Sequence, residues 1–220
     1  MGKGKCRIGL IRVVSFADEG IANLHGQLIE ERFPALSVVS RCIPDQPEGI
    51  YDDATEAKAV PKILELGTQL VEREGLEALI VSCAADPGVE ELRRRVKVPV
   101  IGAGSAAASL ALSYGTRVAT LGITEGTPSV MKRILGSHLV GEAKPTGVKT
   151  TLDLMKPEGK QRVFDTCRAL VERSACQVIA LACTGMSTIG VAKELERETG
   201  IPVIDPVLAS GFCTWFFLTR

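Results

Sequence analysis

The sequence predicts an α/β protein made of two pseudo-symmetric, doubly wound lobes, each with a parallel sheet, and a ligand cleft between them. Two observations carry this prediction. Runs of β-branched and apolar residues alternate along the whole chain with segments that have the hydrophobic period of a helix. The pattern then recurs, with local identities, about 100 residues further on, so we expect an internal duplication.

The expected strands are short buried runs bounded by turn residues. They are predicted at residues 7–14, 36–42, 77–83, 98–102, 117–123, 147–152, 176–183 and 201–205. Helices fill the intervals between them. The segment 55–74, for example, places on one face Val60, Ile63, Leu64, Leu70 and Val71. Alternation of strand and helix favours parallel strands joined by crossover helices.

The repeat has an offset of 100 residues. Leu70-Val71-Glu72-Arg73 recurs as Leu170-Val171-Glu172-Arg173. The strands ALIVSC and VIALAC then place Cys83 and Cys183 at the same offset. Periodicity, strand order and identities agree over most of the chain, so we expect two flavodoxin-like halves that meet near residues 113–115.

Composition excludes several classes of protein. Lys and Arg number 26, as do Asp and Glu, and only 4% of residues are aromatic, which argues against nucleic acid as a partner. No apolar run approaches the length of about 18 residues that a membrane span needs, and no secretory signal is recognised. The seven cysteines form no CxxC pair, and the chain has only two histidines that could join them in a metal site. We therefore expect a cytoplasmic protein without a disulfide framework or a metal site.

Cys83 and Cys183 are the candidate reactive groups. Each ends a buried strand and precedes a helix, at the sheet edge where open α/β folds bind ligands. Short residues surround them in SCAADPG and ACTGMST, and a helix N-terminus lowers the pKa of an adjacent thiol, so both are expected to be partial thiolates. Facing each other across a small-molecule substrate, one thiolate would remove a proton from a carbon acid and the opposite thiol would supply one, without a cofactor.

The remaining cysteines and the two histidines have a different expected role. Core packing is the better interpretation for Cys6, Cys42, Cys167, Cys176 and Cys213. His25 and His138 are expected on the surface or on helices, because neither lies near the candidate cysteines in sequence.

These motifs resemble the aspartate/glutamate/hydantoin racemase superfamily over essentially the whole chain. Cys83-Ala84-Ala85-Asp86-Pro87-Gly88 is similar to the first cysteine motif of hydantoin and allantoin racemases, and Ala182-Cys183-Thr184-Gly185-Met186 to the second. The resemblance implies an isomerase with catalytic Cys83 and Cys183, without metal or pyridoxal cofactor, forming a homodimer or larger homo-oligomer. It also implies that residues 1–102 and 206–220 form lobe one, and residues 103–205 lobe two.

The resemblance also assigns substrate contacts and narrows the substrate. The expected substrate-binding residues are Ser15, Ala84, Ala85, Thr124, Thr127, Thr184 and Gly185. Aspartate and glutamate racemases usually have Asn-Thr where this chain has Ala84-Ala85, and hydantoin racemases usually have Asn-Pro-Asn where it has residues 12–16. We expect inversion of a stereocentre in a hydantoin-like cyclic amide or an amino-acid derivative. Maleate isomerase-like or aspartate/glutamate racemase activity on the same fold is the alternative.

Three further features remain open. Gly102 and Gly104 follow a strand and open an Ala-rich helix, as in a dinucleotide-binding fingerprint. The same cleft could also serve a non-catalytic small-ligand sensor. Exposure of Trp215, Phe216 and Phe217 in the apolar C-terminal segment would indicate a subunit interface.

Overall fold

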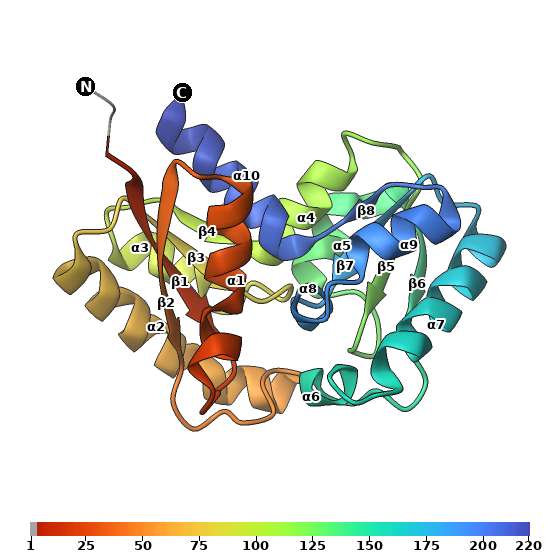
Figure 1. Cartoon of the computed structure of the whole chain (residues 1–220), viewed down its shortest axis with the longest axis horizontal. Coiled ribbons are helices and arrows are strands. Elements are labelled where there is room, and N and C mark those ends of the chain that lie inside the picture. The colour runs from red at the N-terminus through yellow and green to blue at the C-terminus, as the bar shows by residue number, and fades with distance from the viewer. Residues whose placement is uncertain (1–3) are drawn as a thin grey trace.

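The computed structural model describes residues 4–220 and contains two four-stranded parallel sheets with helices on both faces (Figure 1). The strand orders are β2-β1-β3-β4 in the first sheet and β6-β5-β7-β8 in the second. In each sheet the first strand in sequence lies between the second and the third, and the fourth lies at the edge beside the third. The two sheets therefore have the same topology. The predicted fold class, two similar α/β lobes with parallel sheets, is confirmed.

The first sheet is formed by the N-terminal half of the chain. Its strands are β1 (Cys6–Arg12), β2 (Leu36–Cys42), β3 (Ala78–Ser82) and β4 (Val100–Gly102). Its helices are α1 (Glu19–Arg32), α2 (Asp53–Glu74) and α3 (Val89–Arg95). The long helix α2 begins with a capping box, in which the Asp52 carboxylate accepts from the Thr55 N–H and the Thr55 hydroxyl accepts from the Asp52 N–H. This fixes where the chain turns into α2 beside the cleft.

The second sheet repeats the arrangement. Its strands are β5 (Val118–Gly122), β6 (Leu139–Ala143), β7 (Val178–Ala182) and β8 (Val203–Ile204). Its helices are α5 (Ser129–Leu135), η1 (Gly136–His138), α6 (Thr151–Leu154), α7 (Gly159–Ser174), α8 (Gly185–Thr188) and α9 (Ala192–Thr199). The helix α7 is the counterpart of α2, and its Val163 and Leu170 are buried against the sheet.

The sixth strand was predicted in the wrong place. Residues 147–152 were expected to be a strand because they are rich in β-branched residues, but the strand is β6, and Thr151 already belongs to α6. Thr150 and Asp153 form a capping box that starts this helix, and the reciprocal hydrogen bonds outweigh β propensity. The true strand is a half-exposed edge containing Gly141, where a Cβ would press against Ser174 of α7.

The chain passes between the lobes twice. Helix α4 (Ala103–Ala111) directly follows β4 and packs its alanines against Val178 and Ala180 of the second sheet. Helix α10 (Pro206–Thr219) begins one residue after β8 and packs against β3 of the first sheet, with Val207 buried in the core of that lobe. The two helices lie side by side between the lobes (Figure 1). Their packing positions the carboxyl ends of the two sheets relative to each other.

Candidate active site

Cys83 and Cys183 line one cleft of about 650 Å³ at the carboxyl ends of the two sheets. Cys83 follows the last residue of β3, and Cys183 follows the last residue of β7. Each thiol comes from a different lobe, and each residue is less than a tenth exposed. The structure thus brings the two candidate cysteines to the same cavity.

Most of the expected substrate-binding residues also line this cleft. They are Ala84, Ala85, Thr124, Thr127, Thr184 and Gly185. Ser15 is not among the residues that line it. Its hydroxyl donates to the Ile43 carbonyl oxygen at 2.7 Å and accepts from the Gln46 N–H at 2.8 Å. Ser15 therefore holds two loops of the first lobe together.

The expected lowering of the thiol pKa values is not found. Burial raises the pKa of the Cys83 thiol, and the neighbouring Cys183 and Asp86 act in the same direction. Burial also raises the pKa of the Cys183 thiol. Hydrogen bonds from the N–H of Ala85 to Cys83, and from two N–H groups of α8 to Cys183, oppose this effect without outweighing it. Desolvation depends on the tertiary structure, so the reasoning from helix dipoles alone missed it.

Thr151 is a site residue that the sequence analysis missed. Its hydroxyl hydrogen-bonds to Cys183 and so favours the thiolate. Gly185 makes room for it, since a Cβ at Gly185 would lie 2.5 Å from Cγ2 of Thr151 and 3.3 Å from Sγ of Cys183. The capping-box pattern of Thr150 and Asp153 was the signal that could have placed a helix start, and hence Thr151, at the cleft.

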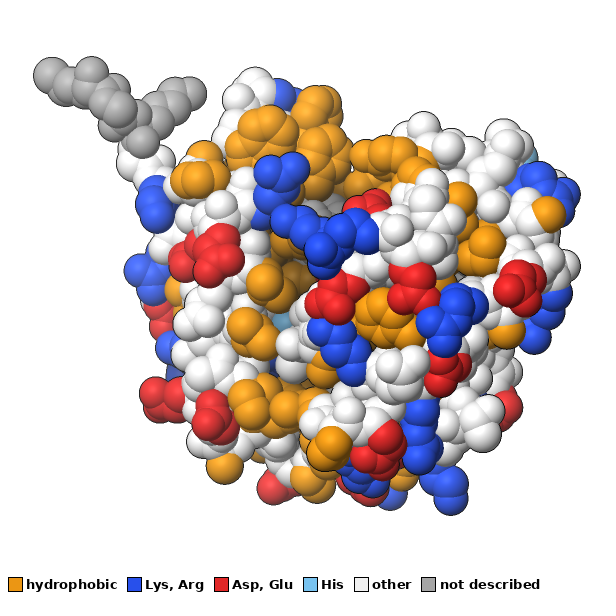
Figure 2. Space-filling model, turned by 45° about the vertical axis from the view of Figure 1, so that its right-hand side comes forward, with side chains coloured by type: hydrophobic (Ala, Val, Ile, Leu, Met, Phe, Trp, Pro, Cys, Tyr) orange, Lys and Arg blue, Asp and Glu red, His pale blue; other side chains and the backbone are white. Residues whose placement is uncertain are grey.

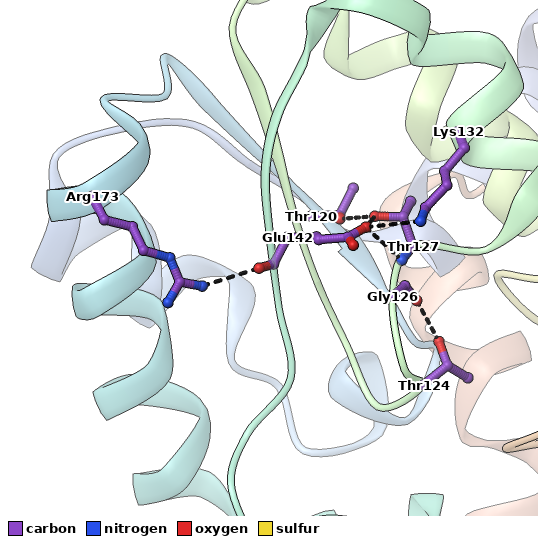
Figure 3. Close-up of polar contacts among 7 residues, drawn as sticks. All are labelled: Thr120, Thr124, Gly126, Thr127, Lys132, Glu142 and Arg173. Atoms are coloured by element: carbon purple, nitrogen blue, oxygen red, sulfur yellow. Dashed lines mark hydrogen bonds and ion pairs between the residues drawn. The ribbon is translucent and has the colours of Figure 1, made fainter.

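The loop after β5 is held by a carboxylate from the neighbouring strand (Figure 3). Glu142 of β6 accepts from the Thr127 N–H at 2.9 Å and from the Thr127 hydroxyl at 2.7 Å. The Thr127 hydroxyl also forms a hydrogen bond with the Thr120 hydroxyl, and Nζ of Lys132 forms an ion pair with Oε2 of Glu142 at 3.2 Å. The Thr124 hydroxyl donates to the Gly126 carbonyl oxygen. Both hydroxyl protons of this loop are thus donated inside the lobe, which orders the wall of the cleft.

Asp86 explains the glycine pair that resembles a dinucleotide fingerprint. Its carboxylate accepts from the N–H groups of Gly104 at 2.7 Å and Ser105 at 2.9 Å, at the start of α4. Cβ atoms at Gly102 and Gly104 would overlap Asp86 and the Ala84 backbone. The N-terminus of α4, where a dinucleotide phosphate would bind, is therefore occupied by a side chain of the Cys83 loop. The glycines are explained by close packing.

A carboxylate also caps the helix that follows the second sheet, but here it comes from the residue just before that helix. Asp205 accepts from the N–H groups of Val207 and Leu208 at the start of α10. Ser187 of α8, which follows Cys183, donates to the same carboxylate at 2.8 Å. We call residues 82–86 and 183–188 the two cysteine turns. Hydrogen bonds thus connect the first turn to the start of α4 and the second to the residue that caps α10.

The charges around the cleft are mostly negative. Asp52, Asp53, Glu56 and Glu125 line it. Arg12 is the one Lys, Arg or His residue of the described chain that lines it, and it is almost fully buried. Its Nη1 donates to carbonyl oxygens of α1 at Ile21 and Ala22, and its guanidinium lies over the Phe16 ring. Burial lowers the pKa of Arg12 to about 10, so it stays protonated at neutral pH.

The other cysteines and histidines divide between core and surface. Cys167 and Cys176 are buried in the core of the second lobe, as expected, whereas Cys6, Cys42 and Cys213 are only partly buried. His138 lies on the surface. His25 lies on α1 but is fully buried, which the sequence did not indicate.

Residues 4–220 contain no group of three or more His, Cys, Asp or Glu side chains placed to hold a metal ion. Over the same residues, no helix has both the length and the apolar character to cross a membrane.

Comparison with known proteins identifies the family. The family model described as "Asp/Glu/Hydantoin racemase" matches residues 21–210. The chain belongs to this family. By this membership it is a racemase-type enzyme. A hydantoin racemase of Pseudomonas sp. (strain NS671) is 26% identical over 187 residues, covering 79% of this chain and 70% of the relative. A hydantoin racemase of Rhizobium meliloti is 28% identical over 173 residues, covering 76% of this chain and 70% of the relative.

Solved structures of this family have the same fold. Allantoin racemase from Klebsiella pneumoniae superposes with a TM-score of 0.84 at 22% identity, over 98% of this chain and 88% of that one. Glutamate racemase from Thermus thermophilus superposes with a TM-score of 0.68 at 16% identity, over 99% of this chain and 82% of that one.

Proposed function

We propose that this racemase inverts a carbon-acid stereocentre of a hydantoin-like cyclic amide by proton transfer between Cys83 and Cys183, without a cofactor. The observation that carries the proposal is the placement of two thiols, one from each lobe, on the walls of one cleft. A substrate carbon between them would have one thiol on each face. The similarity to hydantoin racemases and to an allantoin racemase supports the substrate class.

The chemistry requires a carbanion whose charge is delocalised. One thiolate takes the proton from the stereogenic carbon, and the C–H electron pair moves into an enolate on the adjacent carbonyl oxygen. The opposite thiol then gives its proton to the other face of the carbon, and the charge returns to sulfur as a thiolate. Main-chain N–H groups of the turns at Thr124 and Thr184 are the donors we assign to the enolate oxygen, since the hydroxyl protons of Thr124 and Thr127 are already donated.

The charge of the cleft favours a cyclic amide over a free dicarboxylic amino acid. Aspartate and glutamate carry two carboxylates, which the acidic side chains of the cleft would repel. Arg12, the cation on this wall, is engaged by carbonyl groups of α1 and by Phe16. A hydantoin ring has no carboxylate, so it meets no such repulsion. Aspartate/glutamate racemase activity is the alternative tested alongside, and maleate isomerase-like activity is a second alternative.

The test is polarimetry on single enantiomers of 5-substituted hydantoins, allantoin, aspartate and glutamate, together with proton NMR in heavy water. We expect inversion of the cyclic amides, and loss of inversion in both Cys83→Ser and Cys183→Ser. Each serine variant should retain solvent exchange from one enantiomer, with opposite preferences. Faster inversion of aspartate than of any hydantoin would overturn the substrate assignment. Bound hydantoin with no exchange at carbon would instead indicate a ligand sensor.

We further propose a homo-oligomer in the cytoplasm. Phe212, Phe216 and Phe217 of α10 are 38%, 57% and 41% exposed, and hydrophobic side chains gather at the end of the molecule where α10 lies (Figure 2). Phe33 and Trp215 stack beside them, which makes a continuous aromatic face. Light scattering after size-exclusion chromatography should show at least a dimer, and Phe216→Glu should shift it toward a monomer. A reducing compartment suits the seven free cysteines.

A further inference from the structure

A buried histidine that the chemistry above does not use lies between the two lobes. His25 of α1 is fully buried, and both of its ring nitrogens are hydrogen-bonded. Nδ1 lies 2.8 Å from the Ser82 hydroxyl, and Nε2 lies 2.9 Å from the Thr188 hydroxyl. A neutral imidazole has one donor and one acceptor nitrogen, and a hydroxyl can take either role, so the ring is fully satisfied. It joins the first lobe to the second.

The partners of His25 belong to the two cysteine turns. Ser82 is the last residue of β3 and directly precedes Cys83. Thr188 ends α8, the helix that begins two residues after Cys183. The Thr184 hydroxyl, next to Cys183, donates to the Ser82 carbonyl oxygen at 3.2 Å. We call His25, Ser82, Thr184 and Thr188 the interlobe clasp.

The surroundings of His25 keep its ring neutral. Burial lowers the pKa of His25 well below its usual value, and the positive charge of Arg12 acts in the same direction. Arg12 and Ser82 are register partners on neighbouring parallel strands, so their side chains share the sheet face that α1 covers. The ring of His25 on α1 therefore contacts β3 of the first lobe and α8 of the second.

We propose that His25 is a positioning residue, which sets through the interlobe clasp how the thiols of Cys83 and Cys183 face each other across the cleft. The proposal rests on the two-thiol racemisation proposed above. Inversion requires both thiols to be aligned with one carbon at the same time. Exchange of the proton with solvent on one face requires only one thiol. Loss of the clasp therefore lowers inversion more than it lowers exchange.

The experiment compares variants that remove or keep the bond between the lobes. His25→Phe keeps an aromatic ring and Thr188→Val keeps the side-chain shape, but neither can form the bond between Nε2 and the hydroxyl. Thr188→Ser keeps the hydroxyl and should behave as the wild type. Thr199→Val is the matched control, because the Thr199 hydroxyl donates within its own helix, to Leu195. Inversion is followed by polarimetry and exchange by proton NMR in heavy water, on one enantiomer of a 5-substituted hydantoin.

In His25→Phe and Thr188→Val we expect the ratio of inversion to exchange to fall on the order of tenfold, with little change in KM, because misalignment affects the chemical step. The double variant should be no worse than the more impaired single variant, since both changes remove the same bond. Thr188→Ser and Thr199→Val should keep the wild-type ratio. An unchanged ratio in both clasp variants, or an equal loss of inversion and exchange, overturns the proposal.

A measurement without substrate separates this proposal from the proposed function. Amide hydrogen exchange is measured by mass spectrometry over residues 82–86 and 183–188 in the same variants. Loss of the clasp should speed exchange in both cysteine turns, whereas Thr199→Val should leave both unchanged. Unchanged protection in His25→Phe and Thr188→Val overturns the clasp whatever the substrate is. Loosened turns in a protein whose wild type inverts no hydantoin would sustain the clasp and reject the proposed function.

Discussion

Gly104→Ala tests whether the glycine pair serves packing against the Cys83 loop. A Cβ at Gly104 would lie 2.7 Å from the carbonyl carbon of Ala84 and closer still to its oxygen, whereas real Cβ atoms essentially never come within 3.0 Å of another atom. The obstacle is backbone, so no rotamer change relieves it. Either the start of α4 or the turn that carries Cys83 must move.

The magnitude follows from two opposing effects. Forcing an extra carbon into a packed site costs about 1–3 kcal/mol, and the upper end applies where backbone must shift. Replacing glycine by alanine within a helix returns up to about 1 kcal/mol. We therefore expect Gly104→Ala to lower the free energy of unfolding by about 2 kcal/mol. Displacement of the Cys83 turn by about 1 Å should also lower kcat for inversion by roughly a hundredfold.

The assay is urea denaturation together with polarimetry, and Gly20→Ala is the control. Gly20 lies in the first turn of α1, where a Cβ would meet only the Asp18 side chain, at 3.0 Å. That side chain caps α1 by accepting from the Ile21 N–H at 2.9 Å, but it needs to give by only a few tenths of an ångström, so Gly20→Ala should change the free energy of unfolding by less than about 1 kcal/mol. If Gly104→Ala is as stable and as active as the wild type, the close approach to Ala84 does not require glycine, and our account of the motif is wrong.

The remaining predictions concern protons. Because burial raises the pKa of both thiols, kcat for inversion should climb steadily between about pH 7 and pH 9, and a plateau across this range would contradict the raised values. Thr151→Val removes a hydrogen bond that favours the Cys183 thiolate, so it should move this profile further to alkaline pH, and Thr151→Ser should restore it. The pKa of His25 is lowered by folding, so the unfolded chain binds more protons below about pH 6.5, and stability due to this residue is lost as the pH falls. Below about pH 6.5 the free energy of unfolding of the wild type should therefore fall by up to about 1.4 kcal/mol more per pH unit than that of His25→Phe. Urea midpoints at several pH values measure this difference, and parallel curves for the two proteins would refute the lowered pKa of His25.

The sequence by itself determined the two α/β lobes, most of the strands in their sheets, and the equivalent positions of Cys83 and Cys183. Seven of the eight strands lie close to the predicted ranges, because burial of one face or of a whole strand imposes a local period that a single chain displays. The equivalence of Cys83 and Cys183 followed from the repeat alone. Their common position at the sheet edge followed from the geometry of parallel strands, which all end on the same side.

Only the tertiary structure decided how the site is held together. Sixteen residues or more separate Asp86 from the helix that it caps, His25 from Ser82, and Ser15 from Gln46, and no local pattern reports such pairings. The same limit applies to the thiols. A helix start next to a cysteine is visible in sequence, but the desolvation that raises the pKa of the thiol is the summed effect of atoms that only folding brings around it. Short-range periodicity therefore specifies the elements, while the long-range contacts between them specify the chemistry of the cleft.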